Sequence, residues 1–184
     1  MSKMGKAKIG SVIAAAGVVL FFSFWQRTPN VAEIGGYSPD FTLPVLSTGS
    51  GAPAPLHLYE HRGHVVLVNF WATWCPPCIE EAPSLEAFSA QMQKMGVEVI
   101  GVSVDQDPEA LKSFVATYHL TFPIVRDPDQ AVSAKFGTRQ FPETYILDRD
   151  GRVADKIISS RDWTDPLMIS FVESLAHPNQ SPAE

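Results

Sequence analysis

Two cysteines are the residues best suited to chemistry in this chain of 184 residues, and the chain has no others. Cys75 and Cys78 are separated by Pro76 and Pro77, and they follow the apolar run 65–71. This order predicts a thiol pair where a buried strand meets the start of a helix. A helix N-terminus offers unpaired N–H groups and a partial positive charge, and both favour a thiolate. A thiolate with a second thiol within bonding reach is a reversible redox centre.

The two thiols are expected to have different roles. Cys75, at the helix start, is the predicted nucleophile, because its sulfur can accept a hydrogen bond from the N–H of Cys78. Pro76 in the first turn removes no donor that the helix needs. Pro77 removes a further N–H, so the thiol is expected to be moderately activated. Cys78, one turn further and shielded, is the predicted resolving thiol.

Two other residues are candidates for the site. Glu81 follows Cys78 by three residues, so it lies on the same helix face. It could exchange a proton with Cys78 and hold thiol pKa values up. A solvated carboxylate beside Glu80 fits the spacing equally well. Pro142 begins a predicted strand, where it is either a cis proline or an ordinary turn proline.

A metal site is the main alternative for a Cys-x-x-Cys pair. Zinc requires four ligands, and the chain supplies no Cys-partnered histidine spacing. Its histidines are His57, His61, His64, His119 and His177. A copper site would need a histidine or methionine cluster, which is not evident. A disulfide across so short a loop is a poor staple. The prediction is therefore a working redox pair, with no metal and no other cofactor.

The first part of the chain predicts a membrane anchor. Lys3, Lys6 and Lys8 precede an uncharged run over residues 9–25, and Arg27 follows it. We expect a cytoplasmic N-terminus at 1–8, a transmembrane signal-anchor at 9–26 and a catalytic domain outside the cytoplasm. A cleaved signal peptide is the alternative, but no small-x-small pattern follows the apolar core. No cysteine lies nearby to serve a lipoprotein.

The remainder predicts one acidic domain. After Arg27 the chain has ten Lys and Arg residues against twenty Asp and Glu, a net charge of −10, so a nucleic-acid partner is not expected. We expect a linker at 27–36, a domain at 37–176 and a polar tail at 177–184.

Hydrophobic patterns and turn residues predict the elements of this domain. Expected strands are 41–46 and 56–59 as a hairpin, then 65–71, 97–104, 122–125, 144–147 and 153–158. Expected helices follow the cysteines as far as Gly96, begin at Pro108, cover 131–136, and begin again at Pro166. In the last helix Leu167, Ile169, Phe171, Val172 and Leu175 are expected to face inward. This order indicates an α/β domain with a mixed central sheet.

The motifs together resemble the thioredoxin-like superfamily, and most of all its membrane-anchored TlpA, ResA and CcmG branch. Residues 69–78 with Glu81 and Pro83 resemble the active-site strand and helix of that branch, and residues 37–44 its N-terminal hairpin. Residues 141–148 resemble its cis-proline strand, and residues 108–137 stand where it has an extra helix–strand insertion. The similarity covers roughly residues 37–175.

The resemblance implies a thiol–disulfide oxidoreductase. It implies that Pro142 is cis and lies beside the cysteines, and that Phe141 offers backbone to a substrate strand. Trp74 and Pro76 are the other expected substrate contacts. Glu81 matches the acidic residue of that branch. A buried Asp of thioredoxin itself is replaced by Asn69.

The predicted function is reduction of exported protein disulfides, with electrons from a membrane thiol donor. Residues 142–144 look closest to the cytochrome c maturation members, so apocytochrome c is the expected substrate. A disulfide oxidase or isomerase is the first alternative, separable by reduction potential. A metal-binding or docking module without exchange activity is the second. A peroxidase would need an arginine near its thiol.

Overall fold

The computed structural model describes residues 31–46 and 54–177. The predicted segments 1–8 and 9–26 lie outside the described residues, as do residues 27–30 of the predicted linker and residues 178–184 of the predicted tail. None of the helices in the described part has the length and apolar character required to cross a membrane.

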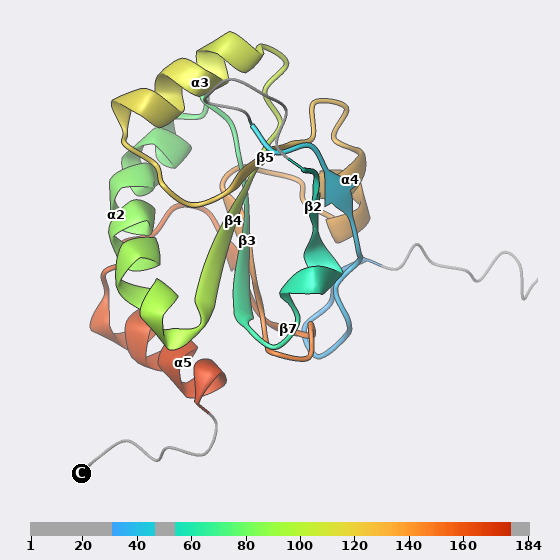
Figure 1. The fold of residues 1–184 in the computed structure, drawn as a ribbon, viewed down its shortest axis with the longest axis vertical. Helices are drawn as coiled ribbons and strands as arrows, with labels where there is room; N and C mark the ends of the chain where they lie inside the picture. The colour runs from blue at the N-terminus through green and yellow to red at the C-terminus, as the bar shows by residue number, and fades with distance from the viewer. Residues whose placement is uncertain (1–30, 47–53, 178–184) are drawn as a thin grey trace, which may run out of the picture. The chain divides into compact units, whose positions relative to one another are not determined.

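A five-stranded mixed sheet forms the centre of the domain, in the order β5-β4-β3-β6-β7 (Figure 1). β3 (Val65–Trp71) pairs in parallel with β4 (Val97–Ser103), which pairs in parallel with β5 (Ile124–Arg126). On its other side β3 pairs antiparallel with β6 (Glu143–Leu147), which pairs antiparallel with β7 (Val153–Ile158). The predicted mixed α/β sheet is confirmed.

β3 lies at the centre of the sheet, and all seven of its residues are buried. Its side chains alternate between two apolar cores. Leu67 belongs to the core that contains Phe88 and Trp163, whereas Val68 belongs to the core that contains Phe136. A continuous apolar run is what a strand covered on both faces requires.

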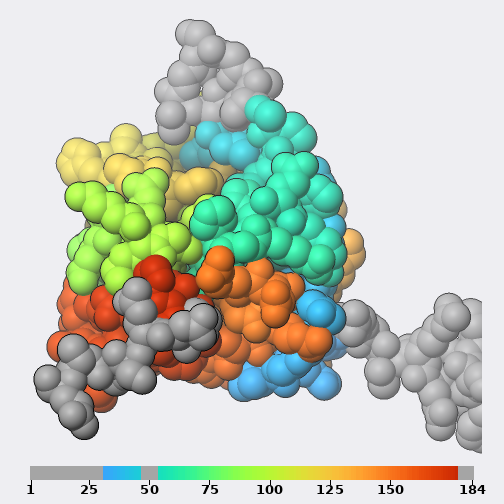
Figure 2. Space-filling model, turned by 60° about the horizontal axis from the view of Figure 1, so that its bottom comes forward, coloured from blue at the N-terminus to red at the C-terminus, as the bar shows by residue number. Residues whose placement is uncertain are grey.

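Helices and the hairpin cover the two faces of the sheet (Figure 1). The helices are α2 (Pro76–Met92), α3 (Pro108–Thr117), α4 (Ala131–Phe136) and α5 (Pro166–Ala176), with 3-10 turns η1 (Leu58–His61) and η2 (Gln93–Met95). α2, α3 and α5 contribute to one core, while α4 and the hairpin contribute to the other. The packing of α5 against the end of α2 is visible from two sides (Figures 1 and 2).

Helix starts follow the predicted capping residues. Asp107 accepts a hydrogen bond from the N–H of Glu109, and Asp165 accepts one from the N–H of Leu167. A proline follows each aspartate at the first helical position, where its missing N–H is not needed.

The hairpin is confirmed but shorter than predicted. β1 (Thr42–Leu43) pairs antiparallel with β2 (Leu56–His57). The chain then turns into η1, because the carboxylate of Asp40 accepts a hydrogen bond from the N–H of Tyr59 at 3.2 Å and bends it away from β1. β5 also begins later than predicted, since Pro123 has no N–H to donate to a ladder.

One expected burial in the last helix is wrong. Leu167 is 79% exposed, although it was expected to face inward. α5 buries a single stripe of Met168, Val172 and Ala176, each four residues after the last, and Leu167 stands off that stripe. The remaining predicted residues behave as expected: Val172 is buried, and Ile169, Phe171 and Leu175 pack against the core while partly exposed.

Candidate active site

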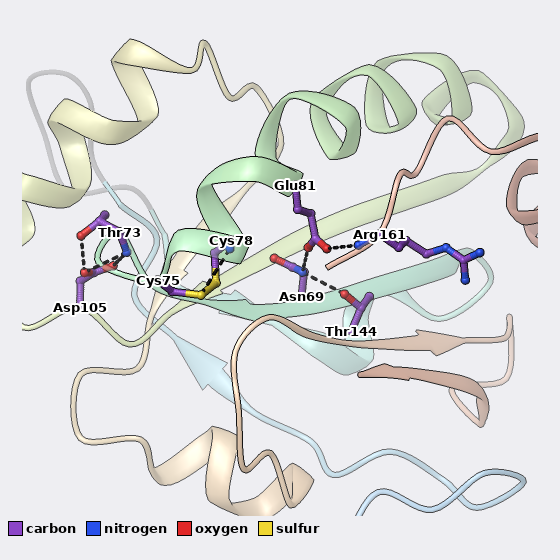
Figure 3. Close-up of a disulfide and its surroundings, with 8 residues drawn as sticks. All are labelled: Asn69, Thr73, Cys75, Cys78, Glu81, Asp105, Thr144 and Arg161. Carbon is purple, nitrogen blue, oxygen red and sulfur yellow. Dashed lines mark hydrogen bonds between the residues drawn. A yellow bond between two sulfur atoms is a disulfide. The ribbon is translucent and has the colours of Figure 1, made fainter. Parts of the chain in front are cut away.

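The cysteine pair lies at the junction of β3 and α2. β3 ends at Trp71, a short turn follows, and Cys75 is the N-cap residue of α2. Its sulfur accepts a hydrogen bond from the N–H of Cys78 at 3.3 Å, as predicted (Figure 3). The two cysteines are joined by a disulfide, with their Cα atoms 5.3 Å apart. Both are buried, Cys75 with 5% and Cys78 with 3% of its surface exposed.

Glu81 is a buried carboxylate and not a solvated one. Only 3% of the residue is exposed, one turn along α2 from Cys78. Its two oxygens accept hydrogen bonds from Asn69 Nδ2 at 2.8 Å and from the N–H of Arg161 at 3.1 Å (Figure 3). The alternative of a solvated helix carboxylate is therefore wrong.

The pKa of Glu81 is raised to about 7, because burial disfavours the ionised carboxylate more than its hydrogen bonds favour it. A carboxyl group with this pKa can accept or release a proton near neutral pH.

Glu81 and Cys78 face the same small cavity. Asn69, Trp71 and apolar residues complete its lining, and about 10 Å³ is available to the centre of a water molecule. That volume is at the lower limit for holding one water. Glu81 and Cys78 therefore share the lining of one small cavity beside the disulfide.

The Phe141–Pro142 peptide bond is cis, as the resemblance implied. Pro142 immediately precedes β6, and the pairing of Glu143 with Phe70 sets it at the end of the sheet where β3 leads to the cysteines. The ring of Phe141 meets the ring of Trp74 edge to face, with centroids 6.2 Å apart.

The surface around the pair is apolar. Trp74 is 64% exposed, Pro76 is exposed and Phe141 is partly exposed. Within the described residues, neither the N–H nor the carbonyl of Phe141 has a backbone partner. The structure thus brings the expected substrate contacts to one end of the sheet.

Several residues of the site were not found from the sequence. Thr144 accepts a hydrogen bond from Asn69 Nδ2 at 2.9 Å, so the amide bridges β6 and α2. Arg161 acts through its backbone, which no side-chain pattern can indicate. Asp105 accepts hydrogen bonds from Thr73, in the turn before Cys75. Its position directly after the predicted strand 97–104 could have indicated that Asp105 has a structural role. The sequence does not indicate which turn its side chain would contact.

Metal ligands do not converge in the described part of the chain. No group of three or more His, Cys, Asp or Glu side chains is placed to hold an ion there. The absence of a metal and of any cofactor beyond the cysteine pair stays a prediction.

Comparison with known proteins decides the family. The model of the AhpC/TSA family matches residues 34–156, about two thirds of the chain. The chain belongs to the AhpC/TSA family. A relative, the thiol-disulfide oxidoreductase ResA of Geobacillus thermodenitrificans, is 36% identical over 148 residues, covering 80% of this chain and 81% of the relative. The thioredoxin-like protein YneN of Bacillus subtilis is 32% identical, covering 78% and 82%.

Solved structures of similar proteins support the same fold. A candidate thiol:disulfide interchange protein DsbE from Chlorobium tepidum has a TM-score of 0.71 at 26% identity, covering 79% of this chain and 99% of that one. A secreted disulfide oxidoreductase of Mycobacterium tuberculosis, homologous to DsbE, has a TM-score of 0.59 at 26% identity, covering 75% and 95%. The predicted thioredoxin-like fold, the resemblance to ResA and the thiol–disulfide oxidoreductase activity are confirmed.

Proposed function

We propose that this protein is an extracytoplasmic, membrane-anchored reductant of disulfides in exported proteins. One observation carries the proposal: the Cys75–Cys78 disulfide lies at the start of α2 beside a buried carboxyl group, Glu81, whose pKa is about 7. The pair can therefore exchange electrons while a neighbouring group exchanges protons at neutral pH.

The first step begins from the reduced protein. The Cys75 thiolate attacks one sulfur of a substrate disulfide, a new S–S bond joins the two proteins, and the substrate disulfide breaks. The other substrate sulfur leaves as a thiolate and takes a proton from solvent. The N–H of Cys78, which donates to the Cys75 sulfur in the oxidised state, stabilises negative charge on that sulfur.

The second step releases the substrate. Cys78 gives its proton to the ionised Glu81 across the shared cavity, directly or through one water, and its thiolate attacks the Cys75 sulfur. The mixed disulfide breaks and the substrate leaves with two reduced sulfurs, while the protein keeps the Cys75–Cys78 disulfide seen here. Two electrons have moved to the substrate, so a donor dithiol must return two electrons to the protein before the next cycle.

Substrate recognition is assigned to the apolar surface around the pair. The rings of Trp74 and Phe141 and the exposed Pro76 offer apolar contact. The unpaired N–H and carbonyl of Phe141, beside the cis Pro142, can bond an extended substrate backbone. Such a surface would select substrates by an extended backbone and apolar side chains more than by charge.

Location and partners follow from the N-terminal sequence and from the chemistry. The uncharged run over residues 9–25, with lysines before it and Arg27 after it, supports a single-pass anchor with the domain in the periplasm or its equivalent. A dithiol kept reduced there needs a membrane thiol donor. Apocytochrome c, with paired haem-attachment cysteines, is the proposed substrate, and its support is the likeness of residues 142–144 to the cytochrome c maturation branch.

A trapping experiment tests the proposal. In Cys78→Ala the first step proceeds and the second cannot, so full-length protein expressed in a bacterial host is expected to accumulate mixed disulfides with exported proteins. Cys75→Ala is the matched control and should trap none, because it lacks the attacking thiol. Recovery of no exported protein by Cys78→Ala would contradict the proposed substrate class.

The reduction potential separates reductant from oxidant. A value near that of thioredoxin, roughly −270 mV, supports the proposal, whereas a value near −120 mV indicates an oxidase. Stoichiometric zinc or copper in protein purified without added metal, together with no disulfide reductase activity, would instead favour a metal-binding module.

A further inference from the structure

Asp105 is a buried acid that the proposed chemistry does not use. It follows the C-terminal end of β4, and only 3% of its surface is exposed. Its carboxylate accepts hydrogen bonds from the N–H of Thr73 at 3.0 and 3.2 Å, from Thr73 Oγ1 at 2.6 Å and from Ser103 Oγ at 2.8 Å (Figure 3). Most of these contacts are with a residue in the turn that leads to Cys75.

The turn has few other supports. Between the end of β3 and the start of α2, the N–H of Cys75 donates to the carbonyl of Ala72 at 3.3 Å. The N–H of Val104 donates to the carbonyl of Trp71 at 3.1 Å, which holds the ends of β3 and β4 together. Asp105 is the only acceptor for the N–H of Thr73 among the described residues. The carboxylate therefore ties the turn to β4.

Asp105 forms no direct ion pair among the described residues. Within residues 31–46 and 54–177, no Lys, Arg or His nitrogen lies within 4.0 Å of its carboxylate. Arg126 on β5 directs its guanidinium to the carbonyl of Gln106, the next residue, at 3.2 Å. Thr73 and Cys75 are two residues apart, so their Cα atoms are at most about 7.6 Å apart.

We propose that Asp105 is a positioning residue for Cys75: its carboxylate fixes the turn that presents this sulfur, and its charge opposes formation of the Cys75 thiolate. The role rests on the proposed function, in which Cys75 is the nucleophile. An anion at this site stabilises the thiol and the disulfide against the thiolate, and so makes the pair more reducing. The buried carboxylate of Asp105 thus favours electron donation by the cysteine pair.

Other charged groups stand on the elements that meet here. They are Glu80 and Glu81 of α2, Asp107 at the start of α3, Arg126 of β5 and Arg139 in the segment before Phe141. Glu80, Asp107 and Arg139 are exposed, so solvent screens them. Asp105 is buried on the Cys75 side of the pair, as Glu81 is on the Cys78 side.

The test compares Asp105→Asn with Asp127→Asn in the full-length protein. Asp127 is a matched control, because it also follows a strand, is fully buried and accepts hydrogen bonds from the N–H groups of Val132 and Ser133, but it contacts no residue of the Cys75 turn. The Cys75 thiol pKa is measured from the pH dependence of alkylation of the reduced protein. The reduction potential is measured by equilibration with glutathione.

Asp105→Asn is expected to lower the Cys75 thiol pKa by about one pH unit and to make the reduction potential less negative, because it removes one negative charge bonded to the turn before Cys75. Asp127→Asn should change neither. If both variants leave the two values unchanged, the proposed role of Asp105 is overturned. The readouts need no substrate, so this outcome is distinct from a failure of Cys78→Ala to trap exported proteins.

A second variant covers the case in which Asp105→Asn does not fold. Thr73→Val keeps the charge and removes the hydroxyl donor at 2.6 Å. The thiol pKa should then stay the same or rise, since the carboxylate has lost a group that offsets its charge. A fall in the Cys75 thiol pKa in Thr73→Val would show that turn geometry alone governs the thiol, and would overturn the proposal.

Discussion

Two buried carboxylates flank the cysteine pair, and they are held very differently. Asp105, on the side of Cys75, accepts hydrogen bonds from the backbone and hydroxyl of Thr73 and from Ser103. Glu81, on the side of Cys78, has one donor for each oxygen, from Asn69 and from the backbone of Arg161. Both are 3% exposed, so burial does not distinguish them.

The difference shows that an equal exposed fraction does not give two buried acids the same role. Glu81 lines a small cavity beside Cys78, and burial outweighs its hydrogen bonds, so its pKa rises to about 7. The carboxyl group of Glu81 is therefore suited to proton exchange near neutral pH. Asp105 is bonded to a turn and a strand end, and it suits positioning. Variants at each acid and at its donors test this contrast.

The largest expected effect is the loss of the Asp105 carboxylate. Asp105→Ala should lower the free energy of unfolding by about 4 kcal/mol, because it leaves several buried donors without an acceptor. Denaturant unfolding of the oxidised protein measures it. Asp165→Ala removes the half-exposed cap of α5 and should cost about 1 kcal/mol. Equal losses of unfolding free energy in the two variants would show that the buried hydrogen bonds of Asp105 stabilise the fold no more than an ordinary helix cap does.

The next effect is the pH dependence that Glu81 gives to stability. Its pKa rises from 4.5 to about 7 on folding, so between these values the folded protein holds a proton that the unfolded chain has released. Stability therefore falls as pH rises through this window and stays lower above it. The loss amounts to about 3 kcal/mol.

Glu81→Gln should remove this slope. We expect the variant to be more stable than the wild type by about 3 kcal/mol near pH 8 and to match it near pH 4, as measured by denaturant unfolding at each pH. Glu80→Gln is the control, since that neighbour is exposed on the same helix and should leave the slope intact. A wild-type slope retained in Glu81→Gln would contradict the raised pKa.

A smaller effect is expected at the donor of Glu81. Asn69→Ala removes a hydrogen bond that favours the ionised carboxylate, so the pKa of Glu81 should rise by about one further unit. Infrared difference spectra of the carboxyl stretch, recorded across the pH range, measure this pKa. An unchanged pKa would mean that Asn69 does not bond the ionised form.

The smallest effect is expected one contact further away. Thr144→Val removes the hydroxyl that accepts from Asn69 and keeps the shape of the side chain. Stability should fall by about 1 kcal/mol, and the pKa of Glu81 should change less than in Asn69→Ala. A larger change in Thr144→Val would place the main influence on Glu81 in β6.

Much of the fold was predictable because local patterns and packing agree. The apolar run 65–71 became a buried strand, and the Asp–Pro pairs at Asp107 and Asp165 began helices as expected. Leu167 was predicted wrongly, because a strongly apolar helix does not reveal which stripe its neighbours will cover. The second hairpin strand was predicted too long, because its end depends on a hydrogen bond from Tyr59 to Asp40, 19 positions earlier in the chain.

The site was predictable where its residues are close in sequence. Cys75, Cys78 and Glu81 lie within seven residues, and helical spacing was enough to group them. Their hydrogen-bond partners were not predictable, since they come from other strands and loops. Asn69 shows the limit: it falls within the predicted strand 65–71, but its two partners, Glu81 and Thr144, depend on how α2 packs on the sheet and on the register of β3 with β6.

The separations of these contacts along the chain have a consequence for assembly of the protein. Cys75 and Cys78 are neighbours in any conformation, so their disulfide can form in a chain that has not folded. The contacts made by Asp105, Thr144 and the backbone of Arg161 join residues 32, 75 and 80 positions apart, and they exist only once the sheet is complete. In a newly synthesised chain the cysteine pair therefore lacks these long-range hydrogen bonds. The selectivity of the pair among its partners is acquired at the last stage of folding.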